Sequence, residues 1–172
     1  MRSNSFCRWL VLSACGFLLG AAYLLAVQSD SAVQHDQQMA DMKEHGAAAM
    51  GFDQDKTAHH FFLRKDGGVI TVRAKNPKDV TSISQIQHHL ALQAGKFSRG
   101  DFGAPEETHS RVPPGVPAMQ EMKDEIRYQF RKSRQGGKLR ISSSNPTAIE
   151  AIHQFLKFQI QEHQTGDPTT LH

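Results

Sequence analysis

A short series of landmarks occurs twice along the chain, and this repeat constrains the fold more than any other feature. Each copy has a phenylalanine, then a Gly-Gly pair, then an alternating run that ends at Asn-Pro. The first copy comprises Phe61, Gly67-Gly68 and Asn76-Pro77, and the second comprises Phe130, Gly136-Gly137 and Asn145-Pro146, 69 positions later throughout. A fixed offset over several landmarks indicates a duplicated structural unit.

Each unit predicts two strands joined by a tight turn and followed by a helix. Glycine favours the turn, and proline is favoured just inside a helix start. In the helical stretches the offset is 66, so that Ile86, Leu90 and Gln93 match Ile152, Leu156 and Gln159. Apolar residues there recur at the spacing of one buried helix face. Two such units predict an α+β fold, with a four-stranded antiparallel sheet and both helices on one of its faces.

The rest of the chain divides around these units. The predicted segments are a cytoplasmic N-terminus at 1–8, an apolar segment at 9–27, a polar stalk at 28–56, the first unit at 57–101, a proline-rich crossover with little regular structure at 102–122, the second unit at 123–167 and a tail at 168–172.

The apolar segment, Trp9–Val27, contains no charged residue and is long enough to span a bilayer as a helix. Arg2 and Arg8 precede it, so the positive-inside rule keeps the N-terminus in the cytoplasm and exports the remainder. We therefore expect a single-pass protein of the bacterial inner membrane with its folded part in the periplasm. A cleaved signal peptide and lipidation at Cys15 are the alternatives.

Both cysteines, Cys7 and Cys15, lie in or beside this segment. The exported part then has neither a disulfide nor a thiolate ligand. Any site in it must be built from histidine, methionine, carboxylates and other polar groups.

Histidine is abundant, with ten in 172 residues. Imidazole and thioether donors without cysteine favour copper, particularly Cu(I). Because neighbouring strand residues face opposite ways, we expect His59 to face the core, as an interior residue or a ligand, and His60 to face outward. His163 is expected on the surface. The candidate metal ligands are His45, Met50, His59, His60 and His109.

The sheet face away from the helices is expected to be basic. The same alternation places His60, Thr71, Gln129 and Lys138 on it, together with the candidate partner-binding residues Phe62, Arg64, Arg73, Arg127, Arg131 and Arg140. Export argues against nucleic acid as the partner. An envelope protein, an anionic surface or a second copy of the chain fits such a face better.

Familiar catalytic motifs are missing from the sequence. It contains no G-x-S-x-G, H-E-x-x-H, phosphate-binding loop of the Walker type or G-x-G-x-x-G. We therefore expect a non-enzymatic binding module for a transition metal, with an envelope-assembly module as the alternative. A hydrolase would require a cleft in which His109 meets a carboxylate.

Several stretches, namely MGFDQDKTAHHF, RVPPGVPAMQ, IRYQF, GGKLRIS and IHQFLKFQIQEHQTGD, resemble an uncharacterised family of exported bacterial proteins. The resemblance covers roughly residues 45–168 and carries no established activity. It implies that Met50–Phe61 and Arg111–Pro117 belong to the folded domain. The aspartate carbamoyltransferase label that some look-alikes carry does not suit this chain, which lacks that enzyme's Ser-Thr-Arg-Thr carbamoyl-phosphate loop and is too short for its two domains.

Overall fold

The computed structural model describes residue 37 and residues 50–171. The chain divides into two compact units, Met1–Asp41 and Met42–His172, and the fold described below belongs to the second. Among the described residues, no helix is long and apolar enough to cross a membrane. The predicted span at 9–27 and the candidate ligand His45 lie outside the described residues.

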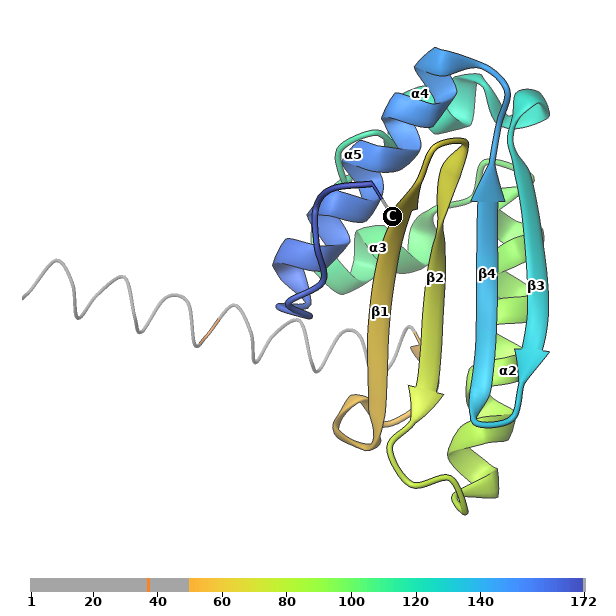
Figure 1. Ribbon diagram of the computed structural model, residues 1–172, viewed down its shortest axis with the longest axis vertical. Coiled ribbons are helices and arrows are strands. Elements are labelled where there is room, and N and C mark those ends of the chain that lie inside the picture. The colour runs from red at the N-terminus through yellow and green to blue at the C-terminus, as the bar shows by residue number, and fades with distance from the viewer. Residues whose placement is uncertain (1–36, 38–49, 172) are drawn as a thin grey trace, which may run out of the picture. The chain divides into compact units, whose positions relative to one another are not determined.

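The predicted α+β architecture is confirmed. The sheet is four-stranded and antiparallel, in the order β1-β2-β4-β3 (Figure 1). The elements are η1 (Gln54–Lys56), β1 (Thr57–Arg64), β2 (Gly67–Ala74), α2 (Val80–Phe97), α3 (Gly103–His109), α4 (Val116–Glu121), η2 (Lys123–Glu125), β3 (Arg127–Ser133), β4 (Gly136–Ser142) and α5 (Pro146–Glu162).

Each helix packs mainly on the hairpin of the other unit. Helix α2 follows the first hairpin but contacts β3 and β4, whereas α5 follows the second hairpin and contacts β1 and β2 (Figure 1). The two units therefore interlock, and neither hairpin is covered without the helix of its partner unit. Because each helix covers the hairpin of the other unit, the two units share a single core.

The Gly-Gly pairs permit this close packing. A Cβ on Gly68 would lie 2.1 Å from Leu156 of α5, and one on Gly137 would lie 3.0 Å from Leu90 of α2. The two leucines occupy equivalent places in the repeat, so each helix sets the same side chain on the other unit's glycine. The Gly-Gly pairs therefore allow the helices to pack closely on the sheet, in addition to forming the turns.

The core lies between the sheet and the helices. Its fully buried members include Phe61, Val72, Leu139, Ile141 and Leu156. The cluster runs from Phe52 to Ile160, wholly inside the unit Met42–His172. Because every core residue in the described part of the chain lies within this unit, we treat it as an independently folding domain in the experiments below.

Three details differ from the expectations. The crossover contains helices α3 and α4, because Gly115 fits closely against the Ala151 carbonyl and thereby docks the start of α4 on α5. The segment from Met50 to Lys56 is part of the domain and not of a stalk, since Phe52 is only 4% exposed. Helix α2 begins at Val80 with Asp79 as its cap, and not at the Asn-Pro pair.

Candidate functional site

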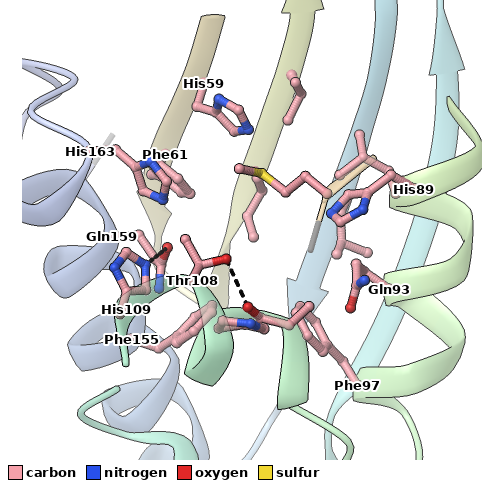
Figure 2. Close-up of a pocket in the computed structure, with 17 residues that line it drawn as sticks. His59, Phe61, His89, Gln93, Phe97, Thr108, His109, Phe155, Gln159 and His163 are labelled. Carbon is pink, nitrogen blue, oxygen red and sulfur yellow. Dashed lines mark hydrogen bonds between the residues drawn. The ribbon is translucent and has the colours of Figure 1, made fainter. Parts of the chain in front are cut away.

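A pocket opens between the sheet and helices α2, α3 and α5 (Figure 2). We call it the imidazole pocket, and its volume of about 70 Å³ is enough for a few water molecules or one small ligand. Its lining residues are Met50, His59, Phe61, Ile70, Val72, His89, Leu90, Gln93, Phe97, Ala104, Pro105, Thr108, His109, Leu139, Phe155, Gln159 and His163.

Equivalent positions of the repeat line the pocket from both helices. Helix α2 contributes His89, Gln93 and Phe97, and the 66-residue offset pairs these with Phe155, Gln159 and His163. The glutamine is the same in both copies, but histidine and phenylalanine have changed places. Of these six residues, Figure 2 accordingly shows His89 and His163 toward one end of the pocket, the two glutamines in the middle, and Phe97 and Phe155 toward the other end.

Four histidines reach the imidazole pocket from four separate places in the fold. They are His59 on β1, His89 on α2, His109 at the end of α3 and His163 just beyond α5 (Figure 2). The ring centroids of His59 and His163 are 5.4 Å apart, and those of His109 and His163 are 5.2 Å apart. His163 is therefore the central ring of three in contact.

Burial keeps these imidazoles uncharged. It lowers the pKa of His59 and of His89 to about 4, and the neighbouring histidine charges act in the same direction. Burial also places the pKa of His163 well below its usual value and lowers that of His109. At neutral pH each ring therefore offers a nitrogen lone pair.

Several polar atoms in the pocket lack a hydrogen-bond partner. They are Gln93 Oε1, Gln159 Nε2 and His109 Nδ1, all buried. The other ring nitrogen of His109 lies 3.2 Å from Gln159 Oε1. Because unpartnered buried polar groups are costly, these atoms are the ones that a ligand or water in the pocket would satisfy.

The charged groups nearest the pocket lie behind His109. Glu162 Oε2 is 3.8 Å from His109 Nδ1, and the same carboxylate accepts a 2.6 Å hydrogen bond from Arg111. Among the described residues that line the pocket, none is an aspartate or a glutamate. Its interior is therefore neutral, with one partly neutralised carboxylate beside it.

The structure brings three of the five candidate metal ligands together, namely Met50, His59 and His109. His60 lies on the opposite face of the sheet, where its Nδ1 is 3.0 Å from Asp167 Oδ1. In the part of the chain that the structure describes, no three side chains of histidine, cysteine, aspartate or glutamate stand ready as metal ligands.

Sequence reasoning missed His89 and His163 as pocket residues. The expectation that His163 lies on the surface is wrong, because its ring packs between His59 and His109. The repeat held the signal, since the 66-residue offset matches His163 to Phe97, a buried aromatic residue.

The sheet face away from the helices has the expected composition. Residues that face each other across the strands form rows, such as His60, Thr71, Lys138 and Arg131. The remaining predicted members of the face take alternate positions in the same strands: Phe62, Arg64, Arg73, Arg127, Gln129 and Arg140.

The chain was also compared with known proteins. No protein-family model, no curated protein and no solved structure matches it.

Proposed function

We propose that the domain is a non-enzymatic binding module whose imidazole pocket binds a transition-metal ion, with Cu(I) as the favoured ion. One observation carries this proposal: four uncharged histidines and Met50 surround a single pocket that no carboxylate lines. An apolar pocket for an organic molecule does not require so many imidazoles. A metal site uses such rings, because neutral imidazole is the form that binds metals.

The charge of the pocket favours a monovalent ion. A dication in a buried site without lining carboxylates would remain largely uncompensated, which is costly. Cu(I) has a single charge, and it suits the imidazole and thioether donors that His59, His163 and Met50 supply. Glu162 Oε2, 3.8 Å from His109 Nδ1, would polarise that ring through its charge.

The spacing of the rings also suits a shared ion. Two imidazoles bound to one metal at about 2.0 Å hold their centroids roughly 5 to 5.5 Å apart. The separations of His163 from His59 and from His109 fall in this range. Binding would then require only that the imidazole rings rotate without moving apart. His163 would bind the ion together with either His59 or His109. Two imidazoles and a thioether would complete a three-coordinate site.

The chemistry around His109 supports binding over hydrolysis. His109 does meet a carboxylate, Glu162, but a hydrolase also needs a nucleophile or an activated water. Among the described residues lining the pocket, the one hydroxyl belongs to Thr108, and it donates to the Ala104 carbonyl at 2.8 Å.

The test is a Cu(I) competition experiment on the unit Met42–His172 under reducing, oxygen-free conditions. We expect it to withdraw one ion per chain from a coloured Cu(I) chelator. His163→Phe, which introduces the residue at the equivalent position of the repeat, should weaken binding at least about tenfold, since even outer-shell partners contribute that much. His60→Ala, on the opposite face, is the matched control and should bind like the native unit.

Dependence on pH gives a second readout. Because burial lowers the pKa values of His59 and His163, proton competition should barely change the Cu(I) affinity between pH 7.5 and 6. Failure to bind Cu(I), or equal binding by His163→Phe and the native unit, would refute the proposal.

A further inference from the structure

The sheet face away from the helices has a strong excess of positive charge. Both α2 and α5 pack against the other face, since Gly137 and Gly68, which they contact, lie in helix-side rows of the sheet (Figure 1). We call the uncovered surface the open face. Its cations are Arg64, Arg73, Arg127, Arg131, Lys138 and Arg140.

Few carboxylates balance these charges. Asp66 pairs with Arg140, and Asp167 with His60. The other five cations are exposed, and among the described residues none of them forms an ion pair. The chain as a whole has a formal charge of only +3, so the open face concentrates charge that other surfaces offset.

Some of the cations are also placed unfavourably for stability. Arg131 and Lys138 are direct partners across β3 and β4. Like charges directly opposite each other destabilise a sheet. Arg73 lies diagonal to Lys138, which extends the charged area across β2. A cluster of cations that repel one another indicates a surface suited to an anionic partner.

We propose that the open face binds an anionic lipid surface. Complementary charge supports this occupant, because a sheet four strands wide offers its cations side by side to many headgroups. The sequence supports it too: the predicted membrane span ends at residue 27 and the described domain starts at residue 50. The intervening residues 28–49 reach at most about 75 Å when extended.

Other occupants fit the open face less well. Surfaces for single-stranded nucleic acid combine cations with several exposed aromatic platforms. The aromatic rings in these rows are those of Phe62 and His60, which stack on each other and are both half-buried. A second copy of the same face would bring five unpaired cations against five more. A protein partner would have to be strongly acidic.

The test is cosedimentation of the unit Met42–His172 with vesicles, which avoids insertion of the apolar segment. We expect binding to vesicles with 30% phosphatidylglycerol in phosphatidylcholine, little binding to pure phosphatidylcholine, and release by 0.5 M salt. Each cation near an anionic bilayer contributes about fivefold in partitioning, so Arg127→Gln with Arg131→Gln should lower it about 25-fold.

The matched control removes the same charge elsewhere. Arg99 and Lys123 are exposed and lie outside the strands, so Arg99→Gln with Lys123→Gln should change partitioning less than about twofold at equal net charge. Equal loss in both pairs, or no preference for anionic vesicles, would overturn the proposal. If the unit bound single-stranded DNA or polyglutamate more strongly than anionic vesicles, the lipid proposal would be wrong. A nucleic acid or an acidic protein would then be the partner of the open face.

Discussion

The histidines of the imidazole pocket should make the domain sensitive to mild acid. In the unfolded chain an imidazole has a pKa near 6.5, whereas burial holds those of His59 and His89 at about 4. Above pH 6.5 the rings are neutral in both states. As the pH falls from 6.5 toward 4, the unfolded chain binds protons that the folded domain does not, so acid favours unfolding.

The size of the effect follows from these values. Between pH 7 and pH 5 each ring should lower the free energy of unfolding by about 2 kcal/mol, hence by about 4 kcal/mol for the pair. His109 and His163, whose pKa values are also lowered, act in the same direction. Small domains have only about 5–15 kcal/mol in total, so the unit should be markedly weakened at pH 5.

Urea unfolding of the unit Met42–His172 at half-unit pH steps measures this directly. We expect the slope of free energy against pH below 6.5 to correspond to at least two protons taken up on unfolding. His59→Gln should reduce that uptake by close to one proton. His88→Gln, on the exposed side of α2, is the matched control. A free energy that changes by less than about 1 kcal/mol between pH 7 and 5 would mean that the rings are hydrated, and the reasoning would fail.

Two further predictions concern the fold. Gly68→Ala should destabilise the unit by about 1–3 kcal/mol, because the added Cβ would lie 2.7 Å from the Phe62 carbonyl oxygen. Gly95→Ala is the control, since Gly95 lies within α2 and an added Cβ would have its nearest neighbour at 3.5 Å. That change should be neutral or stabilise the unit by up to about 1 kcal/mol. Thermal or urea unfolding distinguishes the two, and equal effects would contradict the packing role of Gly68. Asn145→Ala should cost about 0.5–2 kcal/mol in the same assay, since its side chain accepts the Thr147 N–H at the start of α5, and an unchanged midpoint would contradict that role.

The sheet could be predicted because its signals are local. Alternation within a strand determines which face each residue takes, so His59 and His60 could be assigned to opposite faces from the sequence. The repeat then indicated the number of strands and the position of each helix along the chain. The crossover was harder, because proline-rich sequence does not reveal that Gly115 fits against α5 and starts a short helix there.

The imidazole pocket could not be predicted in full, since it depends on which hairpin each helix covers. Local patterns are silent on that choice. If each helix packed on its own hairpin, a different set of residues from the two helices would line the space above the sheet. The observed exchange instead sets His89 of α2 and His163 beyond α5 around the same cavity, together with His59 from the edge strand β1.

The difference between the two copies, more than the repeat itself, makes the site. With identical copies, each end of the pocket would receive one histidine and one phenylalanine from the two helices, and both ends would be alike. Gln93 and Gln159 keep that symmetry at the centre. The exchange of histidine and phenylalanine breaks it, so that Phe97 and Phe155 contact each other at one end, with centroids 6.2 Å apart, while the imidazoles gather at the other. A ligand that prefers nitrogen donors therefore has one end to occupy, and a duplicated fold provides a single site instead of two.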